Sequence, residues 1–211
     1  MRTETSRSAV MTPDAPMFHA ADRNKDAILG VLREVLPSTG TVVEIASGGG
    51  QHVSFFSAAM PALNWLPSEA VPTLVTHLNT LANANLLPAV AIDVCQPGWD
   101  AAVADTPNAI ISANMIHIAP WEACLGLFEG SARLLGAGGL VYFYGPFVVD
   151  GKFSSDGNES FDRSLRDRNP DWGLRELEMV CEAASGAGFD LDRTVDMPVN
   201  NLSVIFRRKT A

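Results

Sequence analysis

The segment 41–52 restricts the fold of this chain more than any other part of the sequence. It begins with an apolar, β-branched run that carries one acidic residue, Glu44, and then breaks into consecutive glycines at 48–50. Glycine tolerates positive φ and lets the backbone approach a bound molecule, and the first amides of a following helix remain free to donate hydrogen bonds. The segment therefore predicts a strand, a tight turn and the start of a helix arranged around a ligand.

The same segment indicates which ligand the loop suits. A dinucleotide-binding loop has another glycine three residues after Gly50, where this chain has Val53. The acid Glu44 suits a ligand with hydrogen-bond donors or a positive charge, so adenosine joined to an amino acid fits better than NAD. A purely structural turn is the other interpretation, because hairpins and bulges also use adjacent glycines.

Two further acids follow at regular intervals. Glu69 closes the short apolar run 64–69, roughly 25 residues after Glu44, near the spacing at which α/β folds place a ribose-binding carboxylate. Asp93 lies near the end of the apolar run 88–94, where it can accept a hydrogen bond from an adenine amino group. Each acid alone is also typical of a solvated strand end. Their regular placement favours a binding role.

Strand-like and helix-like segments alternate along the chain. Apolar runs predict strands at 41–46, 63–67, 88–94, 109–114, 140–144, 189–197 and 201–207. Helical spacing predicts helices near 22–36, 51–59, 72–83, 121–135 and 173–185. This alternation predicts an α/β fold with a doubly wound, mostly parallel seven-stranded sheet and an antiparallel C-terminal hairpin at one edge. Such sheets bind ligands at the carboxyl ends of their strands.

The length of 211 residues suits one well-buried domain. Residues 1–20 begin with polar residues and proline without periodicity, and we expect them to form a flexible arm. We expect residues 21–211 to form the single domain.

Composition argues against several function classes. The formal charge of -9 argues against nucleic-acid binding, which needs clustered Lys and Arg. No window of about 18 apolar residues is free of charges or breakers, so we expect no membrane span. The cysteines Cys95, Cys124 and Cys181 lie far apart without metal-ligand spacing, so we expect no metal site and reduced thiols in a cytoplasmic protein.

With these segments in place, the chain resembles the class I S-adenosylmethionine-dependent methyltransferases, a Rossmann-like family, over about 22–208. The stretch 44–50 is similar to their first motif, and the closing hairpin is similar to their sheet edge. More narrowly, strings at 22–25, 47–52, 114–121, 144–147 and 200–202 resemble a bacterial methyltransferase-like family catalogued only as a domain of unknown function. That family more often has Gly-Thr-Gly around Gly49 and Asp in place of Glu69.

The resemblance implies S-adenosyl-L-methionine as the cofactor. It implies Glu69 as the ribose contact and Asp93 as the adenine contact. Arg23 is placed to pair with the cofactor carboxylate, or is a solvated arginine at a helix start. The expected cofactor-binding residues are Arg23, Asn24, Glu44, Ala46, Ser47, Gly48, Gly50, His52, Glu69, Asp93, Val94 and Asn114.

Asn114, which ends the predicted fourth strand, and His117, three residues later, are the candidates for the chemistry. Methyl transfer is an in-line displacement, so the protein mainly supplies proximity and, for a protonated acceptor, a base. Asn114 orients the cofactor or the acceptor, or else it caps a turn. His117 is the general base, or else a packed histidine with a structural hydrogen bond. Both interpretations stay open for each residue.

The polar segment 145–171 has the length of a functional loop, and we expect an irregular lid there. Aromatic side chains around it either close an acceptor pocket or form the lid's own small core. The expected acceptor-binding residues are Tyr144, Phe147, Phe161, Trp172, Asn200 and Asn201.

The resulting functional hypothesis is S-adenosylmethionine-dependent methyl transfer to a small-molecule acceptor. One alternative is an enzyme that consumes the cofactor without methylating, by intramolecular cyclisation or lyase chemistry. Another is a non-catalytic cofactor-binding module. The oligomeric state is left open.

Overall fold

The computed structural model describes residues 16–210 of the chain. The first helix, α1, spans Pro16–Val35, so it begins before the predicted position 22. Residues 1–15 of the expected arm lie outside the described residues, whereas 16–20 form the first turns of α1.

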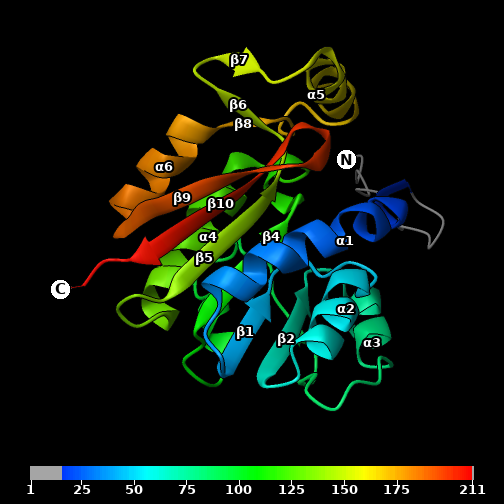
Figure 1. Cartoon of the computed structure of the whole chain (residues 1–211), viewed down its shortest axis with the longest axis vertical. Helices are drawn as coiled ribbons and strands as arrows, with labels where there is room; N and C mark the ends of the chain where they lie inside the picture. The colour runs from blue at the N-terminus through cyan, green and yellow to red at the C-terminus, as the bar shows by residue number, and fades with distance from the viewer. Residues whose placement is uncertain (1–15, 211) are drawn as a thin grey trace, which may run out of the picture.

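Outside the segment 145–176, the remaining strands and α-helices alternate as the sequence predicts (Figure 1). The strands of the main sheet are β1 (Gly40–Glu44), β2 (Leu63–Glu69), β3 (Val90–Ala91), β4 (Ala109–Ala113), β5 (Leu140–Gly145), β9 (Phe189–Met197) and β10 (Asn201–Arg208). The other helices of the main body are α2 (Gln51–Ala59), α3 (Pro72–Leu78), α4 (Trp121–Leu134) and α6 (Leu177–Gly186), with short 3-10 helices η1 (Trp99–Ala102), η2 (Met115–His117) and η3 (Pro198–Asn200).

The seven-stranded sheet has the order β3-β2-β1-β4-β5-β10-β9. Strands β1 to β5 are parallel to one another, and β10 runs antiparallel to both β5 and β9. The predicted mostly parallel sheet with an antiparallel C-terminal hairpin is therefore confirmed. The chain reverses its direction of winding at β1 and β4, where doubly wound sheets bind ligands.

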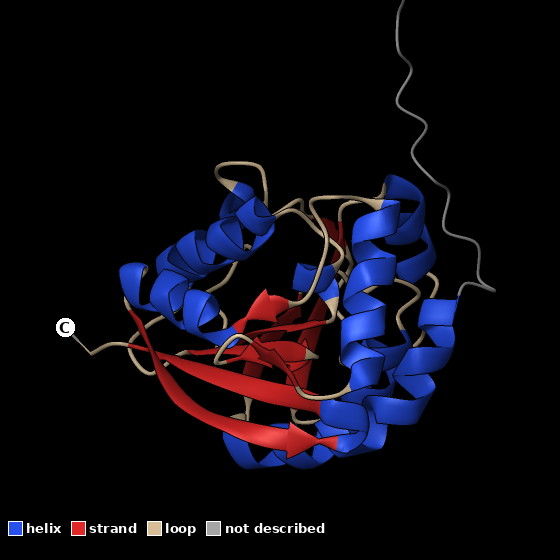
Figure 2. Ribbon diagram, turned by 90° about the horizontal axis from the view of Figure 1, so that it is seen from above, coloured by secondary structure: helices blue, strands red, loops and turns tan. Residues whose placement is uncertain are grey.

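Helices cover both faces of the sheet (Figure 2). Successive side chains of β1 point to opposite faces, so Val42 packs in the cluster with α1 and α2, while Val43 packs in the cluster with α4 and α6. Both valines are fully buried. Two apolar layers thus fix the sheet, and the carboxyl ends of the strands stay clear for loops.

The third strand is much shorter than the predicted 88–94. Of this range only Val90–Ala91 forms a strand, which pairs with β2. Pro88 has no amide hydrogen to donate to the neighbouring strand. The carboxylate of Asp93 turns the chain after the strand by accepting hydrogen bonds from Cys95 N (3.0 Å) and Gln96 Nε2 (3.3 Å).

The expectation of an irregular segment at 145–171 is wrong. The segment forms β6 (Phe147–Val149), β7 (Lys152–Phe153) and the helix α5 (Asp156–Arg168), and β6 also pairs with β8 (Arg175–Glu176). Ser155 caps α5 by accepting a hydrogen bond from Asn158 N at 3.1 Å. The first turn is acidic and the last turn basic, which suits the helix dipole. A helix this polar lacks the apolar spacing that predicts helices.

Two helix ends also differ from prediction. α3 stops at Leu78 rather than near 83. The side chain of Asn79 closes this end: its Nδ2 donates to Val75 O (3.0 Å), and its Oδ1 accepts from Ala89 N (2.9 Å). α6 begins at Leu177 rather than near 173, since 175–176 is a strand.

Candidate functional site

The glycine loop joins β1 to α2 at the carboxyl end of the sheet. Ala46, Gly48 and Gly50 have positive φ values of 58°, 55° and 79°. A side chain at Gly50 would overlap Leu78 and Leu81, so this position needs glycine for space as well as for conformation. Gly50 has no side chain to cap α2, so no side chain of the N-cap residue accepts from the first amides of this helix.

Glu69 ties the end of β2 to this loop. Its Oε2 accepts a hydrogen bond from Gly48 N at 3.0 Å, and its Oε1 accepts one from Ala70 N at 2.9 Å. The residue is 9% exposed, so a largely buried carboxylate lies where the carboxyl ends of β1 and β2 meet. The sequence predicted its place at the strand end, but not its bond to the loop.

Glu44 is a buried acid near this carboxylate. It is 3% exposed, and its Oε2 has no hydrogen-bond partner among the described residues. The pKa of Glu44 is raised to about 7. Burial is the main cause, the hydrogen bond with the Ser47 side chain partly offsets it, and the charge of Glu69 adds to the rise. The carboxyl group is therefore poised to exchange a proton near neutral pH.

A second polar group joins α1 to the sheet. His52 Nε2 lies 2.7 Å from Oδ1 of the buried Asn24, and the His52 ring stacks on Phe56. Burial lowers the pKa of His52 to about 4, so the neutral ring donates to Asn24. Burial raises the pKa of Tyr144, and side-chain hydrogen bonds with Asn24 and Asn201 partly offset this rise. Arg23, beside Asn24, is exposed.

Asp93 and Val94 lie beyond β3, with Asp93 exposed and Val94 buried. α4 packs so closely here that a side chain at Gly126 would overlap the carbonyl of Val94. The indole of Trp99 donates to Gly126 O at 2.8 Å, which fixes the turn after Asp93 against α4.

Asn114 and His117 both follow β4, but their surroundings differ. Asn114 is half-buried with φ 61°, and its backbone amide donates a hydrogen bond to Tyr144 O at 2.7 Å. His117 is 1% exposed and lies edge-on to Phe147, with ring centroids 5.1 Å apart. Burial lowers the pKa of His117 to about 3, and Arg175 lowers it further. Of the two interpretations, the packed histidine fits this geometry, although neither ring nitrogen has a hydrogen-bond partner within residues 16–210.

A cavity of about 360 Å³ opens between β6 and the hairpin of β9 and β10. It is lined by Phe147, Val149, Ser154, Asp196, Met197, Asn200, Asn201 and Leu202. The predicted residues Phe147, Asn200 and Asn201 meet there, whereas Tyr144, Phe161 and Trp172 are not in its lining. Phe161 is 43% exposed on α5, and the Trp172 ring lies under the Arg168 guanidinium.

Sequence reasoning missed two residues that hold this region together, Asp162 and Arg175. Asp162, 6% exposed on α5, accepts from Leu174 N at 2.8 Å, and Arg175 donates to the loop after β4. An acid at helical spacing with Asn158 and Leu165 is the one signal for Asp162. A single arginine in a polar segment carries no signal for Arg175.

Among the described residues, no helix is both long and apolar enough to cross a bilayer. The same residues contain no group of three or more His, Cys, Asp or Glu side chains arranged to hold a metal ion. The three cysteines are free thiols.

Solved methyltransferases share this fold. CalO1, a methyltransferase in calicheamicin biosynthesis in its SAH-bound form, is 16% identical with a TM-score of 0.73, over 91% of this chain and 55% of that chain. The mitomycin 7-O-methyltransferase MmcR is 12% identical with a TM-score of 0.75, over 91% and 55%. Human N-acetylserotonin methyltransferase in complex with SAM is 13% identical with a TM-score of 0.70, over 95% and 61%.

This chain thus spans less than two thirds of the length of these similar structures. At such identities the likeness establishes the fold. A family model described as "Protein of unknown function (DUF938)" matches residues 15–208, which is nearly the whole chain. The chain therefore belongs to the DUF938 family and has a class I methyltransferase-like fold.

Proposed function

We propose that this protein transfers a methyl group from S-adenosyl-L-methionine to a small-molecule acceptor. The observation that carries the proposal is the bond between Glu69 and Gly48, which sets a largely buried carboxylate beside a glycine loop at the point where the sheet reverses its winding. A ribose has two hydroxyl donors for such a carboxylate. The solved structures with SAH or SAM support the same cofactor.

The residues around the loop fit this cofactor chemically. Glu44 has a buried carboxylate oxygen without a partner among residues 16–210, and the first amides of α2 lack a side-chain cap. In this proposal the loop residues Ala46, Ser47, Gly48 and Gly50 bound the cofactor site, and Asp93 and Val94 bound its adenine end. Arg23 and Asn24 close the site from α1, with His52 holding Asn24, and Arg23 pairs with the cofactor carboxylate.

We assign the acceptor to the cavity between β6 and the hairpin. Its lining combines apolar side chains with the polar groups of Ser154, Asn200 and Asn201, which suits a small and partly apolar molecule. Phe147 lines this cavity and also contacts His117. Asn114 lies near Gly145, at the end of β5, and in this proposal its side chain orients the reacting groups. We assign His117 the role of packing the loop, because a buried imidazole with a pKa of about 3 is a poor base. The bound cofactor supplies the electrophilic methyl group.

Incubation with S-adenosylmethionine, first alone and then with metabolite extracts, tests the proposal by mass spectrometry of the products. We expect S-adenosylhomocysteine and a product heavier by one methylene only when an acceptor is present. Consumption of the cofactor without an acceptor would favour cyclisation or lyase chemistry. Binding by calorimetry without any consumption would favour the non-catalytic module.

A further inference from the structure

We infer that Arg175 is a positioning residue that holds the loop after β4, residues 114–119, in the conformation that binds the cofactor. The inference rests on the proposed function, because Asn114 at the start of this loop is the proposed cofactor contact. Arg175 lies on β8, outside the glycine loop and outside the cavity lining.

The guanidinium of Arg175 joins two backbone segments. Its Nε donates to Ile116 O at 2.8 Å, and one terminal nitrogen donates to Ala119 O and, at 2.8 Å, to Asp171 O. The first two carbonyls belong to the loop after β4, at the end of η2 and just before α4. These hydrogen bonds satisfy carbonyls at a helix end and a loop that no helical amide reaches. The planar fork of arginine can bridge them at once, and a lysine ammonium cannot.

Arg175 is itself held in place. Its guanidinium lies over the Trp121 ring at 5.8 Å, and burial lowers its pKa. The neighbouring Gly173 donates its amide to His117 O at 2.9 Å, which gives the loop a second tie. Charge-assisted bonds to carbonyls in a half-buried site are stronger than neutral ones.

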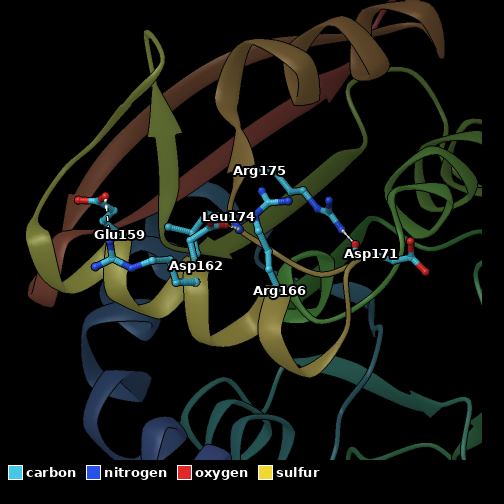
Figure 3. A network of polar contacts seen from close by, with 7 residues as sticks. Glu159, Asp162, Arg166, Asp171, Leu174 and Arg175 are labelled. Carbon is cyan, nitrogen blue, oxygen red and sulfur yellow. Dashed lines mark hydrogen bonds and ion pairs between the residues drawn. The ribbon is translucent and has the colours of Figure 1, made fainter.

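The segment that carries Arg175 is fastened to α5 (Figure 3). Asp162 accepts from Leu174 N at 2.8 Å and from Arg166 Nε at 2.8 Å. Gly173 has φ 146°, and a side chain there would come within 2.8 Å of both Asp162 and Arg166. Helix α5 therefore holds the segment 171–175, and this segment in turn holds the loop after β4.

The test compares Arg175→Met and Arg175→Lys with Arg163→Met. Arg163 is the matched control, because it lies on the nearby helix α5 but forms an exposed ion pair with Glu159, with side chains 65% and 47% exposed. None of its hydrogen bonds among the described residues reaches Asp162 or the segment 171–175. Titration calorimetry with S-adenosylhomocysteine should show affinity reduced roughly tenfold or more by Arg175→Met, less by Arg175→Lys, and within about twofold of wild type for Arg163→Met.

Hydrogen exchange without ligand provides the second measurement. Peptides covering 113–119 and 171–176 should exchange faster in both Arg175 variants and at the wild-type rate in Arg163→Met. Wild-type exchange and wild-type affinity in Arg175→Met would overturn the inference, as would equal losses in Arg163→Met. If Arg175→Met fails to fold, Arg175→Lys decides by the same criteria. If wild type binds no S-adenosylhomocysteine, the proposed function fails, and exchange still reports whether Arg175 holds the loop.

Discussion

The side-chain amide of Asn158 donates a hydrogen bond of 2.9 Å to the backbone carbonyl of Asn200. α5 thereby holds the tip of the β9–β10 hairpin, at one edge of the proposed acceptor cavity. The tip needs such a tie, because Val199 and Asn200 both have left-handed backbone conformations, with φ 61° and 56°. A β-branched residue is disfavoured in this conformation.

Replacing Val199 by Asn should stabilise the protein. Val199 is 82% exposed, so the change removes backbone strain with little loss of packing, and we expect a gain of about 1 kcal/mol in the free energy of unfolding. Urea denaturation measures the change. Val199→Thr is the control, since it keeps the β-branch and should bring no gain. Equal stability of both variants would show that the tip is not strained.

Removing the Glu69 carboxylate should weaken cofactor binding. Glu69→Ala leaves Gly48 and Ala70 amides without their acceptor and the ribose hydroxyls without theirs, so affinity for S-adenosylmethionine should fall roughly ten-fold to more than a hundred-fold. Glu69→Gln keeps one acceptor oxygen and should bind with intermediate affinity. Calorimetric titration that gives wild-type affinity for Glu69→Ala would remove Glu69 from the site.

Glu44 should make stability decrease as pH rises. Its pKa is about 4.5 in the unfolded chain and about 7 in the fold, so the folded state holds the extra proton between these values. Relative to Glu44→Gln, wild type should lose up to about 3 kcal/mol between pH 4.5 and 7, with little further change above. Urea unfolding of both proteins at each pH measures this difference.

His52 and His117 provide an internal control for that comparison. Burial lowers their pKa values to about 4 and about 3, so they lower stability as pH falls below 6.5, in wild type and in Glu44→Gln alike. Parallel stability curves for the two proteins across pH 4.5–7 would mean that Glu44 does not hold a proton in the fold.

Adding one methyl group at Gly145 should disturb the loop after β4. A Cβ there would lie 2.5 Å from His117 Nε2 and 3.3 Å from Asn114 Oδ1, so Gly145→Ala should destabilise the fold by about 1 to 3 kcal/mol. Truncating His117 to Ala in the same chain should relieve part of this loss. Gly30→Ala is the control, because nothing lies within 4 Å of its Cβ position. Equal effects at Gly30 and Gly145 would contradict the predicted clash.

The sheet was predictable because its strands combine apolar runs with turn residues at their ends. Val42 and Val43 face opposite layers and both are apolar, which marks a strand buried on both sides. The segment from β6 to α5 was not predictable in this way. Its helix is stabilised by Ser155 at the cap and by polar contacts of Asn158 and Asp162, which leave no apolar period.

The site was predictable only as far as strand ends place residues. Glu69 and Asn114 lie at the carboxyl ends of β2 and β4, as expected from an α/β fold. The burial of His117 depends on Gly145 and Phe147, which approach it only once the sheet and β6 have formed. Arg175 makes its bonds with backbone carbonyls, and contacts of that kind leave no pattern of residue types in a sequence.

Strand β10 follows β9 along the chain but lies between β5 and β9 in the sheet. During synthesis β5 is therefore completed well before the strand that covers its free edge, and every residue of β5 is buried in the final fold. A ribosome-bound chain, or one cut before residue 201, exposes an apolar strand edge that can pair with another chain. The glycine loop and β1 to β5 are translated earlier, but the sheet is completed only when β10, which lies between β5 and β9, has been made.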